Sequence, residues 1–108
     1  MTLIPVCFFD EMNLYYRSGS IKEFIVPDAA VDYDREMIIK YLSQPFSKAG
    51  CPRAGIDCVT GKEISPSFHL VNDGKYIWGD FLIYHIRNYP VRLPLDFVEH
   101  VRQNSIKR

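Results

Sequence analysis

The sequence lacks a surplus of charge of either sign and lacks any long apolar run, and each absence excludes a class of protein. Lys and Arg together number 13, and Asp and Glu also number 13. A nucleic-acid-binding domain usually carries a basic surplus or a basic stripe, so we expect no direct contact with nucleic acid. A membrane-spanning helix needs roughly 20 consecutive apolar residues. No stretch of this chain approaches that length, so we expect no membrane insertion.

Cysteine is also scarce, and its use argues against an extracellular protein. The three cysteines, Cys7, Cys51 and Cys58, are an odd number, whereas a disulfide framework uses an even number. The N-terminal residues lack the basic start of a secretory signal, and Asp10 and Glu11 cut the apolar run short. We therefore expect a cytoplasmic protein whose thiols are reduced.

No pattern of residues indicates a metal site, a cofactor or a catalytic centre. The separation of Cys51 from Cys58 is too wide for a compact zinc knuckle, and no fourth ligand lies near His69. We interpret His85 and His100 as exposed or half-buried polar positions on helices. The chain is accordingly expected to bind no metal or cofactor and to have no enzymatic activity. A cysteine nucleophile paired with a histidine is the least favoured alternative.

Aromatic side chains are what the sequence has in quantity. They make up 14% of the residues, with 7 Tyr and 7 Phe against 1 Trp. Most of these rings belong in a core, but a tyrosine also keeps a hydroxyl for a hydrated partner and therefore suits protein recognition. The 108 residues match one globular domain, 1–108, with one modest core.

Hydrophobic periodicity and turn residues predict an α+β fold. A small antiparallel sheet is expected to include a hairpin over 68–78, because Asp73-Gly74 accepts the positive φ values of a two-residue loop. A second, smaller hairpin is expected around Thr60-Gly61. About three helices should pack against one side of the sheet, over 34–44, 81–88 and 95–103.

Each predicted helix has an identifiable start. Asp32 or Asp34 should cap the first helix and Asp80 the second, while Pro94 suits the first turn of the third. The tail from 104 to 108 is expected to fray. The first 31 residues are the hardest to interpret; their β-branched content favours a strand over 21–26.

Charge is unevenly distributed along the chain. Residues 10–36 contain seven acidic and three basic side chains. An acidic surface would steer a basic partner toward this region, and nearby tyrosines would anchor it; an ordinary solvated face is an equal alternative. The candidate partner-binding residues are Asp10, Glu11, Tyr15, Tyr16, Asp32, Tyr33, Asp34 and Glu36, with Trp78 and Tyr84 from the later segment.

The segment 69–101 resembles a pattern found in small bacterial immunity proteins. The pattern is a hairpin with an Asp-Gly turn that ends in Trp, an acid-capped helix with aromatic positions, and a final helix that starts with Leu-Pro. It covers roughly a third of the chain. Its residues here are Asp73-Gly74-Lys75-Tyr76-Ile77-Trp78, Asp80-Phe81-Leu82-Ile83-Tyr84, Tyr89, Leu93-Pro94 and Phe97-Val98.

These immunity proteins are encoded beside polymorphic toxins, including those of contact-dependent growth inhibition systems. The resemblance implies a cytoplasmic protein that binds and neutralises its cognate toxin domain. Such toxins are often nucleases with basic clefts, which an acidic immunity surface would cover. A general interaction module or assembly subunit without catalytic activity is the alternative function.

Overall fold

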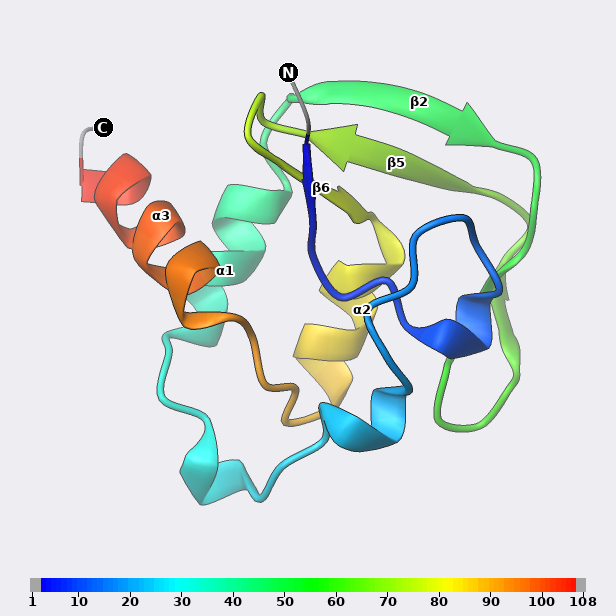
Figure 1. Ribbon diagram of the computed structural model, residues 1–108, viewed down its shortest axis with the longest axis horizontal. Helices are drawn as coiled ribbons and strands as arrows, with labels where there is room; N and C mark the ends of the chain where they lie inside the picture. The colour runs from blue at the N-terminus through cyan, green and yellow to red at the C-terminus, as the bar shows by residue number, and fades with distance from the viewer. Residues whose placement is uncertain (1–2, 107–108) are drawn as a thin grey trace.

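The computed structural model describes residues 3–106 and has the predicted α+β architecture (Figure 1). The strands are β1 (Ile4–Pro5), β2 (Ser47–Cys51), β3 (Gly55–Ile56), β4 (Glu63–Ser65), β5 (Phe68–Asn72) and β6 (Tyr76–Gly79). The α-helices are α1 (Arg35–Leu42), α2 (Phe81–Asn88) and α3 (Leu95–Ile106), and the 3₁₀ helices are η1 (Asp10–Met12), η2 (Ile21–Glu23) and η3 (Asp28–Ala30). No helix of the described residues is long and apolar enough to cross a membrane.

The main sheet has four strands in the order β1-β6-β5-β2. The predicted β5–β6 hairpin is confirmed, and β2 pairs antiparallel with β5. β1 pairs parallel with β6, so the sheet is mixed rather than purely antiparallel. The smaller β3–β4 hairpin is also confirmed as a separate antiparallel pair.

The β5–β6 turn uses the two predicted residues in different ways. Gly74 has a φ of +98°, which glycine adopts without the steric penalty that a Cβ brings. Asp73 has no positive φ; its Oδ1 atom instead accepts hydrogen bonds from the backbone N–H groups of Lys75 and Tyr76, at 3.0 and 2.8 Å. The carboxylate therefore closes the turn.

Helix capping follows the prediction at α1 but not at α2. The Asp34 side chain accepts hydrogen bonds from the backbone N–H groups of Glu36 and Met37, at 3.0 and 3.3 Å. Asp80 was expected to cap α2, but its side chain makes no capping hydrogen bond. Its Oδ2 atom lies 3.2 Å from Nδ1 of His69 on β5, so this carboxylate joins the helix start to the sheet instead.

Two predicted segments differ in the structure. Residues 21–23 form η2 rather than the start of a strand, because Ser20 and Glu23 make a reciprocal capping box around its first turn, and of residues 24–26 Ile25 makes an isolated antiparallel bridge with Val91. Residues 104–106 continue α3 rather than fraying, and Asn104 donates a 2.7 Å hydrogen bond to the carbonyl of His100. Residues 107 and 108 lie outside the described part of the chain.

The core forms where β6 meets the helices. Tyr76 and Trp78 point to one face of β6, where the ring of Phe97 from α3 packs on both, with centroids 5.1 and 6.0 Å away. Tyr41 from α1 lies 6.4 Å from Trp78. Trp78 is 0% exposed, so its ring is fully enclosed in this core.

Candidate functional site

The best-organised polar cluster surrounds Asp57 and is structural. Asp57 Oδ2 accepts hydrogen bonds from the hydroxyls of Tyr84 and Tyr89, at 2.7 and 2.6 Å. Its Oδ1 accepts from the backbone N–H groups of Val59 and Thr60, at 2.8 and 3.1 Å. Burial by itself would raise the pKa of Asp57, but these hydrogen bonds outweigh burial and lower the pKa to about 2. The cluster fastens the β3–β4 hairpin to α2.

His85 also connects α2 to the β3–β4 hairpin, and its position differs from the prediction. It was expected to be exposed or half-buried, but it is 0% exposed. Its Nε2 atom accepts a 2.9 Å hydrogen bond from the backbone N–H of Cys58, and Nδ1 lies 2.8 Å from the carbonyl of Phe81. Burial lowers the pKa of His85, and both of its ring nitrogens are occupied by backbone groups.

A second cluster surrounds Asp73 and ties the β5–β6 turn to two helices. Oδ2 of Asp73 accepts a 2.6 Å hydrogen bond from the hydroxyl of Tyr41 and lies 2.8 Å from Nε2 of His100. Burial would raise the pKa of Asp73, but hydrogen bonds from Tyr41, from the turn backbone and from His100 lower it. His100 is half-buried, as predicted. The cluster joins α1, α3 and the turn.

Two of the three cysteines are buried thiols. All three are free. Burial raises the pKa of Cys7 and of Cys58 to about 12, the opposite of what a nucleophilic thiolate needs. Within residues 3–106 there is also no group of three or more His, Cys, Asp or Glu side chains that could hold a metal ion.

The candidate site is a surface pocket built where two distant segments cross. The backbone N–H of Val26 donates to the carbonyl of Pro90 at 3.0 Å, and that of Arg92 donates to the carbonyl of Phe24 at 2.7 Å. The Tyr33 hydroxyl donates to the carbonyl of Val91. Segment 24–33 is thus attached to segment 90–92 at both of its ends, and the residues between them arch over a hollow.

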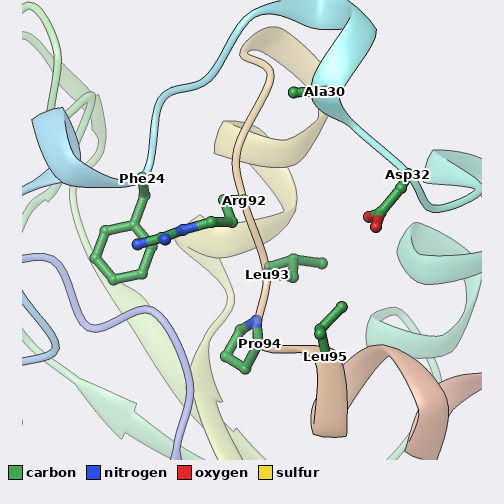
Figure 2. Close-up of a pocket in the computed structure, with 7 residues that line it drawn as sticks. All are labelled: Phe24, Ala30, Asp32, Arg92, Leu93, Pro94 and Leu95. Atoms are coloured by element: carbon green, nitrogen blue, oxygen red, sulfur yellow. The ribbon is translucent and has the colours of Figure 1, made fainter.

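This hollow, which we call the Leu95 pocket, has a volume of about 420 Å³. Figure 2 shows its seven lining residues: Phe24, Ala30, Asp32, Arg92, Leu93, Pro94 and Leu95. Leu95 is 73% exposed although it is a large apolar side chain. Most of the lining is apolar, so the pocket suits an apolar side chain of a partner.

Opposite charges lie at the two ends of the Leu95 pocket. The Arg92 guanidinium lies over the Phe24 ring, 5.5 Å from its centroid, and donates to the carbonyl of Glu23 at 3.3 Å. The Asp32 carboxylate lies at the other end, near the start of α1 (Figure 2). The stacking holds the guanidinium at one end of the pocket. An apolar group that enters would therefore be flanked by one cation and one anion.

The predicted acidic residues do not form one surface. Asp10 and Glu11 lie in η1, whereas Asp32, Asp34 and Glu36 lie at the start of α1, on the other side of the molecule in Figure 1. Glu11 is also occupied, because its Oε1 and Oε2 atoms accept hydrogen bonds from the backbone of Ile21 and the hydroxyl of Ser20, at 2.9 and 2.6 Å. Asp34 is occupied as the α1 cap. Of the five, Asp32 alone lines the Leu95 pocket.

The predicted aromatic contacts are mostly internal. Trp78 is fully buried and cannot reach a partner in this fold. Tyr84 bonds Asp57 and Tyr33 bonds Val91, as described above. Tyr16 packs on Phe8 with ring centroids 5.0 Å apart. Tyr15, at 94% exposure, is the predicted aromatic residue that is fully available to another protein.

Of the seven lining residues, Asp32 is the one that the sequence analysis predicted as a contact; the other six were missed, above all Phe24, Arg92 and Leu95. In the sequence, Leu95 is the first residue of the predicted helix over 95–103. An available signal was that Leu95 lies outside the set Phe97, Val98 and Val101 that forms the apolar stripe of the helix. Nothing local in the sequence places Phe24 beside Arg92.

Comparison of the chain with protein-family models, with curated protein sequences and with solved structures finds no match in any of the three.

Proposed function

We propose that this chain is a non-enzymatic immunity protein that binds and neutralises a cognate toxin domain in the bacterial cytoplasm, with the Leu95 pocket as part of its binding surface. The observation that carries this proposal is the exposed Leu95 side chain in a pocket with Arg92 at one end and Asp32 at the other. This combination of an exposed apolar side chain and separated charges suits the binding of another protein better than it suits catalysis.

The energetics favour a protein ligand. Complete burial of a leucine side chain contributes about 1.5–3 kcal/mol, and Leu95 is mostly exposed, so a partner that covers it gains much of that free energy. The charges at the ends would add orientation and association rate more than affinity. The expected occupant is an apolar side chain of the toxin domain, flanked by a carboxylate that faces Arg92 and a cation that faces Asp32.

The polar groups of the chain favour binding over catalysis. Asp57 and His85 are saturated by internal hydrogen bonds. The seven residues that line the Leu95 pocket include no Ser, Cys or His, and its one acid and one base lie at opposite ends. General acid–base or nucleophilic chemistry needs reacting groups within hydrogen-bond reach of each other.

The resemblance to immunity proteins supplies the class of partner. Its last motif, Leu93-Pro94, lies in the wall of the Leu95 pocket, so the resembling segment contributes directly to the proposed surface. The acidic residues lie on two sides of the molecule, however, and this changes the surface charge expected of the partner. A wholly basic cleft is not the best complement, since Arg92 contributes a cation at the end of the pocket opposite Asp32.

The test is co-expression with the toxin domain encoded directly upstream of this chain in the genome. The proposal predicts that the chain restores growth of cells that express the toxin domain, and that the two purify together as a stoichiometric complex. Co-purification without restored growth would favour a general interaction module. A toxin domain that stays active and unbound beside a folded chain would contradict the proposal.

A further inference from the structure

The outer edge of β2 is an open pairing surface. β2 lies at the end of the main sheet, and no other strand of residues 3–106 pairs with its outer edge. Its pairing with β5 runs from Ser47 to Cys51 without a bulge. Residues 47–50 are exposed and Cys51 is half-buried. An edge strand without an internal proline presents a row of backbone N–H and C=O groups that can pair with another strand.

The hydrogen bonds of β5 show which β2 groups face outward. The backbone N–H of Asp80 donates to the carbonyl of His69 at 2.9 Å, and that of Asp73 donates to the carbonyl of Tyr76 at 3.2 Å. His69 and Asp73 therefore bond toward β6. Successive residues of a strand direct their backbone groups to opposite sides, so Leu70 bonds toward β2.

Leu70 lies opposite Ala49, so Ala49 directs its backbone groups inward to β5. The neighbouring residues Lys48 and Gly50 consequently direct their N–H and C=O groups outward. Within β2, these four backbone groups are the ones that can form hydrogen bonds with a further strand.

The opposite edge of the sheet, formed by β1, has fewer backbone groups that could pair with another strand. β1 has two residues, Ile4 and Pro5, and proline has no N–H to donate. The described sheet thus has one extended free edge. Association through a single edge by a two-fold axis closes after two copies and does not continue into a fibre.

We infer that two copies of this chain pair through β2, antiparallel, with Ala49 opposite Ala49 of the second copy. In this register, Lys48 of each copy lies opposite Gly50 of the other, and the outward groups of both residues form four hydrogen bonds across the axis. Two four-stranded sheets then join into one continuous sheet.

The two neighbouring registers of the β2–β2 pair are less favourable. A shift in one direction places Lys48 directly opposite Lys48 of the second copy, and like charges directly opposite are destabilising. A shift in the other direction places Lys48 opposite Pro52, which has no N–H. The register centred on Ala49 avoids both and places the lysine opposite a glycine, which has no side chain.

A second copy fits this edge better than an unrelated strand. The edge sequence is complementary to itself, as the register shows, and the formal net charge of the chain is zero, so two copies do not repel each other electrostatically. In Figure 1, β2 lies at the top of the view, whereas the cyan segment around 28–33, which includes the pocket residues Ala30 and Asp32, lies at the bottom. The dimer therefore leaves that pocket open, and this inference is independent of the proposed function.

The test combines mass measurement with cross-linking. Sedimentation equilibrium of the wild-type chain should show the apparent mass rising from one chain toward two as concentration increases. Ala49→Cys, made in a Cys51→Ser background, should form a covalent dimer on mild oxidation, because Cβ atoms directly opposite in such a pair lie about 4.5–5.5 Å apart. Gly50→Cys in the same background is the matched control. Its position is exposed and has room for a Cβ, but the two cysteines would be diagonal neighbours about 7–8 Å apart, beyond disulfide reach.

A third variant, Gly50→Pro, removes one outward N–H without removing a bond to β5. It should remain a single chain at concentrations where wild type is dimeric, with the buried emission of Trp78 confirming its fold. The inference is overturned if wild type stays a single chain up to its solubility limit, or if both cysteine variants cross-link equally. A strand of another protein as the true occupant would give the first of these results.

Discussion

The hydroxyl of Tyr89, at the end of α2, donates a 2.6 Å hydrogen bond to Oδ2 of Asp57 in the β3–β4 hairpin. Tyr84 donates to the same oxygen at 2.7 Å. One buried carboxylate therefore accepts two tyrosine hydroxyls from α2 and its C-cap. This relationship holds the small hairpin against the helix.

Replacement of Asp57 with Asn should destabilise the fold by roughly 2 kcal/mol. The amide keeps the size of the side chain but removes one acceptor oxygen, so a buried donor loses its partner at a cost of about 1–3 kcal/mol. Urea unfolding followed by the fluorescence of Trp78 measures the change. Asp32→Asn is the control, because Asp32 is exposed; equal stabilities of the two variants would contradict the assigned role.

Acid should weaken the fold through the same carboxylate. Asp57 has a folded-state pKa of about 2 against an ordinary value of 3.8. A lowered pKa adds stability that is fully present above the unfolded value and is lost as pH falls from there toward the folded value. We expect the unfolding free energy to drop between about pH 4 and pH 2. The drop should be smaller in Asp57→Asn, as measured by urea unfolding across that range.

Gly74 and Gly50 provide a matched test of the β5–β6 turn. A Cβ added at either residue meets no atom within 4 Å, but Gly74 alone of the two has a positive φ. Gly74→Ala should therefore lose about 1 kcal/mol or more through backbone strain. Gly50→Ala should be neutral or slightly stabilising. Thermal unfolding at low protein concentration measures both, and an unchanged melting temperature for Gly74→Ala would refute the turn assignment.

The thiols should react in a fixed order. Burial and the raised pKa of Cys7 and Cys58 leave little thiolate at neutral pH, whereas Cys51 is half-buried on the edge strand. An aromatic disulfide reagent at pH 7 should label Cys51 first and the other two only on unfolding. Mass spectrometry of the labelled peptides identifies the residues. Rapid labelling of Cys7 or Cys58 in the folded chain would contradict the described burial.

Local patterns in the sequence predicted the elements whose signals are local. Ile38, Tyr41 and Leu42 recur at helical spacing within the predicted helix over 34–44 and are all buried, and the Asp73-Gly74 pair located the central hairpin. β2 was missed because Ser47–Cys51 contains no β-branched or aromatic residue; this strand exists through its pairing with β5. Such pairing is a property of the tertiary structure.

The candidate site was harder to predict because its parts are distant in sequence. The 3₁₀ helix η2 shows the same difficulty. The residues around Ile21 have the composition of a strand, yet the Glu11 carboxylate accepts a 2.9 Å hydrogen bond from the backbone N–H of Ile21 and helps to position η2. The contact between Phe24 and Arg92 joins two segments that lie far apart in the sequence. A local count of charges combined Glu11 and Asp32 into one acidic region, although the fold places them on different sides (Figure 1).

The central claim is that the Leu95 pocket binds the toxin domain, and the most direct measurement is the Kd of that domain for two matched variants. Leu95→Asp should keep the fold, because an acidic residue in the first turn suits the dipole of α3. It should weaken binding at least about tenfold, equivalent to about 1.4 kcal/mol. Val59→Asp changes another exposed apolar residue, at 50% exposure, which does not line this pocket, and should leave the Kd close to that of wild type. Equal affinities of wild type and Leu95→Asp, with both folded, would contradict the account.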